Sequence, residues 1–193
     1  MADILEDIKN DLEKAWYDTK DTFEQAKKEY EATEEANMKA ADDYHDLFAW
    51  ADGDLLAYPY SDPNASDQDK MMQTLITMKV KDQNINAPVS GTVISVDPKQ
   101  NIIVIQTPMG NRLGLKICTG AVDFEKDAKI LVSPGQKVRE GDTLVHFIAP
   151  VEAKSKLFAI DSVDKILYQE GYQPRSELGK VSQGEPLLSR PAQ

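Results

Sequence analysis

The chain has 193 residues and a net charge of −11, with 41% hydrophobic and 28% charged residues. This length can bury a substantial core, and the charge argues against nucleic acid or an anionic membrane surface as a partner. The sequence has no run of about 18 apolar residues and no basic, apolar leader, so we expect a cytoplasmic protein without membrane insertion.

Residues 1–50 are predicted to form a strongly acidic helical extension. They hold 15 Asp or Glu and 6 Lys residues, a net charge of −9, and contain neither Gly nor Pro. Apolar residues recur at spacings of three and four, which is typical of a stripe along one side of a helix. The large members of this stripe are Leu5, Ile8, Leu12, Phe23, Tyr30, Tyr44 and Leu47.

Three environments remain open for this stripe. It packs against the body of its own chain, it joins a second copy in a homo-oligomer, or it forms a solvated helix. Ala, Thr and Asn hold many of the other stripe positions, so a coiled-coil seam would be weak. The polar side of the stripe is acidic, which argues against an amphipathic membrane helix.

The body of the chain is predicted to be mainly β. After the turn-rich residues 51–75, short β-type runs such as "LITMKV", "GTVISV", "NIIVIQT" and "RLGLKI" are bounded by Gly, Pro, Asp or Asn. This pattern predicts a compact antiparallel β-barrel or sandwich over residues 51–175. A short helix is expected in "DSVDKILYQEGY", and the tail, residues 176–193, is expected to be extended or disordered.

The body resembles the glucose-type enzyme IIA family of the bacterial sugar phosphotransferase system. "APVSGTVISVDPKQNIIVIQTPMG" resembles the family's "APVDGTV…PTKHAIGIKT..G", and "LVSPGQKVREGDTLVHF" is similar to its "LVKEGDKVKAGDPLLEF". "VDKILYQEGYQP" is similar to the closing "LDKIKAAGYDP". The resemblance covers about residues 51–175 and implies a compact antiparallel β-barrel or sandwich with a duplicated hybrid motif.

The resemblance also implies a site where two histidines face each other. One accepts phosphate from a histidine phosphocarrier protein and passes it to a sugar permease subunit, and the other supports it. In this chain the supporting histidine is replaced by Asn101 and the phosphorylated one by Lys116. The neighbouring family threonine and aspartate fall on Lys99 and Gly120. From the alignment we expect Asn101 and Lys116 to lie on adjacent strands with their side chains on one face.

The remaining reactive side chains are expected to be structural. His45 lies on the acidic extension and His146 on the predicted strand "LVHF", and each is interpreted as an ordinary histidine. The single cysteine, Cys118, excludes an internal disulfide and is interpreted as a packed apolar residue. No catalytic residue, cofactor or metal is predicted. The segment Ile148–Phe158 is expected to be an added edge strand or a packed arm.

These observations favour a protein-binding, regulatory or assembly module that has lost phosphoryl transfer. Imidazole is a good nucleophile near neutral pH, whereas a protonated lysine has no free electron pair and an amide nitrogen is not nucleophilic. The expected partner is a protein such as a sugar transporter, a kinase or a regulator. Two alternatives stay open: a phosphocarrier that uses a non-standard residue such as His146, and a purely structural homo-oligomeric subunit.

Overall fold

The computed structural model describes residues 46–117, 122–161, 172–175 and 177–189. The chain divides into two compact units, Met1–Asp43 and Tyr44–Gln193, and every described residue belongs to the second. Among the described residues, none of the helices combines the length and the apolar character that a membrane crossing requires.

Twelve strands and three short helical segments make up the described part of the second unit. In chain order they are β1 (Asp46–Phe48), β2 (Gly53–Ala57), the 3-10 helix η1 (Pro59–Ser61), α2 (Asp67–Met71), β3 (Thr74–Asn86), β4 (Gly91–Asp97), β5 (Ile102–Gln106), β6 (Arg112–Ile117), α3 (Phe124–Asp127), β7 (Ala128–Ile130), β8 (Lys137–Val138), β9 (Thr143–Ala159), β10 (Gln173–Pro174), β11 (Gly179–Val181) and β12 (Pro186–Ser189).

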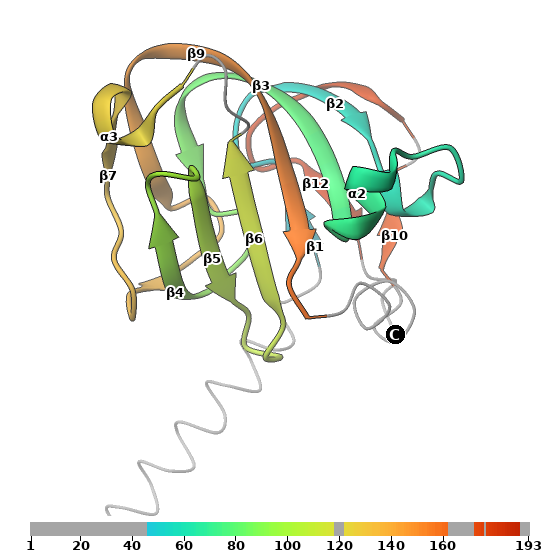
Figure 1. Cartoon of the computed structure of the whole chain (residues 1–193), viewed down its shortest axis with the longest axis horizontal. Helices are drawn as coiled ribbons and strands as arrows, with labels where there is room; N and C mark the ends of the chain where they lie inside the picture. Colours follow the sequence, from blue (N-terminus) through green and yellow to red (C-terminus); the bar gives the residue numbers. More distant parts are fainter. Residues whose placement is uncertain (1–45, 118–121, 162–171, 176, 190–193) are drawn as a thin grey trace, which may run out of the picture. The chain divides into compact units, whose positions relative to one another are not determined.

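The strands form two sheets (Figure 1). The larger has nine strands in the order β11-β2-β3-β9-β6-β5-β4-β8, with β7 paired to β9, and the smaller has the order β1-β12-β10. All pairs are antiparallel. The mainly β, antiparallel prediction is therefore confirmed. The order of the described strands is open at both ends, so they do not close into the barrel that was the other half of the prediction.

The two longest strands, β3 and β9, pair through the middle of the larger sheet. Their register runs from Thr74 opposite Phe158 to Asn86 opposite Thr143, with bulges between. Side chains alternate between the two faces of a strand. Ile76, Met78 and Val80 accordingly point into the core and are fully buried. The inner faces of the neighbouring strands add Ile103, Ile105, Leu113, Leu115, Ile117 and Leu157 to this core.

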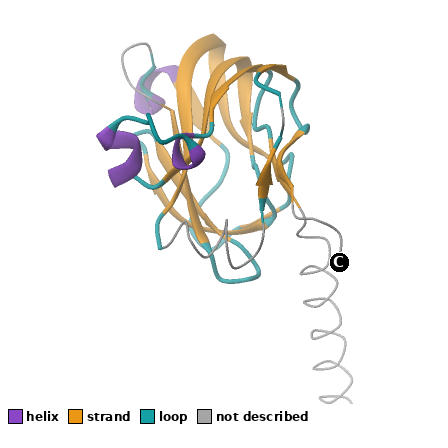
Figure 2. Ribbon diagram, turned by 90° about the vertical axis from the view of Figure 1, so that its right-hand side faces the viewer, coloured by secondary structure: helices purple, strands orange, loops and turns teal. Residues whose placement is uncertain are grey.

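The short helices take no part in the sheets (Figure 2). The segment that carries η1 and α2 contacts β3, and α3 contacts β7 and β9. Ser66 starts α2 by a side-chain cap, because its hydroxyl accepts a hydrogen bond from the Asp69 backbone N–H at 3.2 Å. The η1–α2 segment thus covers part of the outer face of β3.

The start of the body differs from the prediction for residues 1–50. Residues 46–48 form the strand β1, and Leu47 is fully buried opposite Leu188 of β12. Leu47 therefore belongs to the β core, and the assignment of this residue to a helical stripe is wrong. The other six large stripe residues lie outside the described residues, so the helical extension stays a prediction.

The C-terminal tail also differs from the prediction. Within residues 176–193, β11 pairs with β2 and β12 pairs with β1 and β10, and Leu187 and Leu188 are buried. The Tyr58 hydroxyl donates a hydrogen bond to the Leu187 carbonyl at 2.6 Å. The described tail residues are thus part of the fold. The helix expected in "DSVDKILYQEGY" falls mostly on residues 162–171, which lie outside the described residues.

The segment Ile148–Phe158 was expected to be an edge strand or a packed arm. It is instead part of the 17-residue strand β9, which lies between β3 and β6 inside the large sheet. An interior strand needs hydrogen-bond partners on both sides, and β3 and β6 supply them. The apolar character of this segment is explained by its inward-facing residues, such as Leu157, which are buried in the core.

Candidate functional site

Asn101 occupies the turn before β5 and is held inside the fold. Its side chain is 2% exposed, and its backbone φ of 53° lies in the left-handed region, which asparagine tolerates better than most residues. Its amide nitrogen donates to the Val122 carbonyl at 3.0 Å, and its amide oxygen accepts from the Phe124 N–H at 3.1 Å. Both polar groups of the side chain are thus used to fix the segment that leads into α3.

Lys116 lies on β6 in different surroundings. Its cross-strand neighbours are Ile102 of β5 on one side and Lys156 of β9 on the other. The Asn101 carbonyl accepts a hydrogen bond from the N–H of Ile117, which is fully buried on the inner face. Lys116 is half-buried and points to the outer face, because adjacent residues of a strand point to opposite faces. Asn101 precedes β5 and has a φ of 53°, so the strand register does not fix the face of its side chain, and the expected arrangement of Asn101 and Lys116 on one face stays a prediction.

Lys99 and Gly120 are the other two positions matched to the family site. Lys99 is exposed in the turn between β4 and β5, and its backbone N–H donates to the Asp97 carboxylate at 3.0 Å. Gly120 lies outside the described residues, as do Cys118 and His45. Whether the four positions matched to the family site form one cluster therefore stays a prediction.

A buried ion pair that sequence reasoning missed lies beside Lys116. The Lys156 ammonium donates to the Asp69 carboxylate at 2.7 Å, and the two side chains are 10% and 15% exposed. The second oxygen of Asp69 accepts a hydrogen bond from the Ser66 hydroxyl at 2.7 Å. The partners are 87 residues apart, so no local pattern could have revealed them.

The electrostatics of Asp69 reflect this arrangement. Burial by itself would raise the pKa of the Asp69 carboxyl, but the hydrogen bonds from Lys156 and Ser66 outweigh it and hold the pKa below its usual value. Asp69 is therefore ionised near neutral pH and neutralises the charge of Lys156. Of the two lysines that face each other across β6 and β9, Lys116 has no counter-ion within the described part of the chain.

Hydroxyl groups extend the same row of side chains. Thr77 of β3 lies directly opposite Lys156, so Thr77, Lys156 and Lys116 follow one another across three adjacent strands. The hydroxyls of Thr77 and Thr74 are buried, and among the described residues they have no hydrogen-bond partner. Buried polar groups usually have partners, so this part of the outer face is unusual for a purely structural surface.

An apolar strip borders the lysines. The Phe158 ring lies over Gly114 so closely that a Cβ atom at Gly114 would meet the ring at 2.2 Å. Val104 lies opposite Gly114 on β5, and Ile102 lies two residues away, opposite Lys116. The outer face of β5, β6 and β9 thus combines a cationic row with a patch of aliphatic and aromatic side chains.

His146 lies away from these residues. It is on β9, ten residues before Lys156, and is exposed. Its Nδ1 atom is 2.8 Å from the Asn84 side-chain oxygen. Among the described residues, no group of three His, Cys, Asp or Glu side chains is placed to hold a metal ion. His146 therefore stands as a single imidazole with one ring nitrogen engaged.

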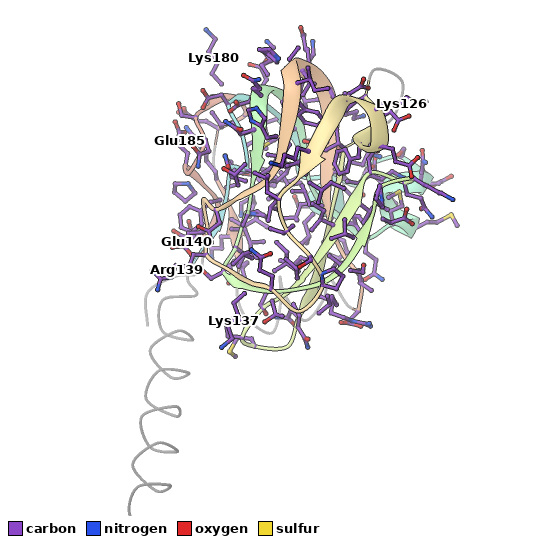
Figure 3. All side chains as sticks on the ribbon, turned by 90° about the vertical axis from the view of Figure 1, so that its left-hand side faces the viewer. Lys126, Lys137, Arg139, Glu140, Lys180 and Glu185 are labelled. Carbon is purple, nitrogen blue, oxygen red and sulfur yellow. The ribbon has the colours of Figure 1, made fainter. Side chains whose placement is uncertain are left out.

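Two hollows occur elsewhere on the described surface. One, of about 150 Å³, is lined mainly by apolar and aromatic side chains that include Tyr58, Tyr60 and Tyr172. The other, of about 340 Å³, contains the Asp54–Lys81 ion pair, Lys180 and Glu185. Figure 3 shows the Lys180 side chain pointing away from the strands above Glu185. Neither hollow includes a residue matched to the family site.

The comparisons with known proteins agree with this architecture. The model of the family described as "phosphoenolpyruvate-dependent sugar phosphotransferase system, EIIA 1" matches residues 46–163. The chain belongs to this EIIA family. The match begins at β1, the strand that contains Leu47, and ends after β9.

A solved structure supports the same fold. Glucose permease IIA from Mycoplasma capricolum superposes with a TM-score of 0.56 and 20% sequence identity, over 74% of this chain and 93% of that one. At this identity the likeness concerns the fold alone. No curated protein matches the chain. The family and the fold are thus shown, and the assignment of Asn101 and Lys116 to the positions of the family histidines stays a prediction.

Proposed function

We propose that this chain is a non-catalytic EIIA module that binds a protein partner, with a regulatory or assembly role in the cytoplasm. The observation that carries the proposal is the state of Asn101 and Lys116. The amide of Asn101 is not nucleophilic, and both of its polar groups are bonded to the 122–124 segment. A lysine ammonium, as at Lys116, has no electron pair with which to attack phosphorus.

Partner binding is supported by the outer face of β5, β6 and β9. Its apolar strip around Phe158 and Gly114 lies next to Lys116 and the buried Lys156–Asp69 pair. Interfaces commonly combine an apolar centre with charged groups at its border. EIIA relatives act through contacts with other proteins, and such a surface can be kept after the phosphoryl chemistry has been lost.

Incubation with the general phosphotransfer proteins and labelled phosphoenolpyruvate tests the proposal. We expect no acid-labile phosphate on this chain, whereas an EIIA protein with both histidines, treated in parallel, becomes labelled. Stoichiometric acid-labile phosphate on the unmodified chain would contradict the proposal that it is non-catalytic.

A second candidate is a phosphocarrier that uses His146. This histidine is exposed, and its Nδ1 atom lies beside the Asn84 oxygen, which leaves Nε2 free if Nδ1 carries the proton. The same labelling experiment separates the candidates when it is repeated with His146→Gln. If the unmodified chain is labelled and His146→Gln is not, the phosphate is on His146, and the phosphocarrier function takes the place of the first proposal.

A further inference from the structure

The outer faces of β3, β6 and β9 carry a group of four lysines, Lys79, Lys116, Lys154 and Lys156, which we name the lysine face. The register places Lys116 opposite Lys156, and Lys154 opposite Lys79. Two of the four are neutralised, because Lys79 pairs with Glu152 and Lys156 pairs with Asp69. Among the described residues, no ion pair engages Lys116 or Lys154.

This residual charge lies on the body of the chain, outside residues 1–50, which carry −9 of the net charge of −11. Like charges on directly opposite positions of a sheet destabilise it. Asp69 relieves this repulsion at Lys156 but leaves Lys116 beside it without an anion. The Lys156 ammonium has three N–H donors, and among the described residues it donates to Asp69. The lysine face therefore has unused donors and two uncompensated charges.

The spacing of the two uncompensated lysines indicates what they would bind. Lys154 and Lys116 are displaced by one strand and by two residues along β9, so their Cα atoms are about 8 Å apart. Lysine side chains are long enough for both ammonium groups to reach one anion, so phosphate is a competing occupant that the test has to separate. Two carboxylates on alternate positions of an extended segment match this separation, since such positions are about 7 Å apart.

We propose that the lysine face binds an acidic segment of a partner protein, with one carboxylate on Lys116 and a second on Lys154. An apolar residue of the same segment lies against Phe158 and Ile102, which border Lys116 on the outer face. This inference deepens the proposed function, because it names the chemistry of the partner at the same surface. The opposite charges of segment and lysine face also speed their encounter and make binding sensitive to salt.

The test uses the full chain and two synthetic peptides. One carries Glu at alternate positions and one Leu, and the other has Gln in place of every Glu. We expect the Glu peptide to bind and to shift the side-chain NMR signals of Lys116, Lys154 and Lys156. The Gln peptide should bind at least about tenfold more weakly, the loss expected for removing charge-assisted contacts. Equal affinity of the two peptides would overturn the proposal.

Charge-removing variants locate the site. Lys116→Gln should weaken the Glu peptide about tenfold, because Lys116 is half-buried, and Lys154→Gln about threefold, because Lys154 is exposed. The matched control is Lys129→Gln, which removes an exposed lysine on β7 opposite His146, and it should leave the affinity unchanged. Equal effects of Lys116→Gln and Lys129→Gln would show that binding follows net charge alone and would contradict the lysine face as the binding site.

Inorganic phosphate provides the final arm. At a concentration equal to that of the peptide, it should shift the lysine signals less and should compete weakly. Phosphate that binds as tightly as the Glu peptide would make the face a general oxyanion site and overturn the acidic-segment proposal. This outcome is independent of the labelling experiment. An acid-labile phosphate on the chain would contradict the non-catalytic function, whereas the peptide affinities alone decide whether the lysine face binds an acidic segment.

Discussion

At the scale of single residues, Asn101 holds two segments of the fold together. Replacing it by Ala removes two buried hydrogen bonds and puts a poorly suited residue at a φ of 53°. We expect Asn101→Ala to lower the free energy of unfolding by about 3 kcal/mol. Asn101→Gly, which accepts this φ, should cost about 1 kcal/mol less. Urea unfolding measures both, and an Ala variant as stable as the wild type would contradict the role given to Asn101.

Two glycines of the large sheet allow a matched comparison of Gly→Ala substitutions, because the added methyl group meets a different neighbour at each. At Gly53 it would lie 2.2 Å from the Lys79 carbonyl oxygen, which is backbone of the neighbouring strand β3. At Gly114 it would meet only the far end of the Phe158 ring. We expect Gly53→Ala to destabilise the protein by about 3 kcal/mol and Gly114→Ala by about 1 kcal/mol, with displacement of the Phe158 ring signals. The reverse order of stabilities in thermal unfolding would refute this account.

At the scale of elements, α2 is fastened to β9 by the Lys156–Asp69 pair. Asp69→Asn leaves a buried lysine without its counter-ion, so we expect a loss of about 3 kcal/mol near neutral pH. Replacing both residues, by Asp69→Asn with Lys156→Met, should recover most of this loss, because no buried charge then remains. Urea unfolding of the single and double variants provides the measurement, and a double variant no more stable than Asp69→Asn would count against a charge effect.

The same pair predicts the direction of a pH dependence. Burial raises the pKa of Asp69, but the bonds from Lys156 and Ser66 dominate, so its folded pKa lies below the ordinary value of 3.8. The stabilisation it gives is therefore complete above the ordinary value and is lost as the pH falls through the folded one. The stability difference between wild type and Asp69→Asn should shrink on acidification below about pH 4. A difference that stays constant down to about pH 2.5 would exclude Asp69 as the titrating group.

The strand β12 makes the C-terminal residues part of the core. Leu187 is fully buried, whereas Leu178, nine residues earlier, is 59% exposed. We expect Leu187→Ala to lower the free energy of unfolding by about 3 kcal/mol and Leu178→Ala to change it by less than about 0.5 kcal/mol. Chemical unfolding of both variants distinguishes a structural tail from a dispensable one, and similar small effects would favour the latter.

The elements differ in how far the sequence could predict them. Runs such as Ile102–Gln106 consist of consecutive residues that favour strands, so the mainly β fold could be predicted from the sequence. β1 and β11 are three residues long, which is too short for any periodicity to show. Leu47 fitted a helical spacing because a single position cannot distinguish the two periods. The Lys156–Asp69 pair joins residues that only the folded sheet brings together, and the surroundings of Asn101 depend on the 122–124 segment in the same way.

At the scale of the whole molecule, the boundary between the two units decides how the chain can be shortened. A chain that begins at Tyr44 keeps β1, whereas one that begins at Ala49 lacks Leu47, the buried partner of Leu188. We expect residues 44–193 to unfold at the same urea concentration as residues 44–193 do within the full chain. Residues 49–193 should be less stable by about 3 kcal/mol. Circular dichroism during urea unfolding gives both values, and equal stabilities would mean that β1 adds nothing to the core.

The same truncation tests the acidic N-terminal stripe, which lies outside the described residues. Left in water, its large apolar side chains would each forgo about 1.5–3 kcal/mol of burial, so a covering surface is favoured over a solvated helix. If that surface is a second copy, sedimentation should give residues 44–193 a smaller mass per particle than the full chain. Two extensions that each carry a charge of −9 repel each other, so about 0.5 M salt should strengthen the association of the full chain by screening. Equal particle masses at every salt concentration would exclude a second copy and leave packing within one chain, a different protein or a solvated helix.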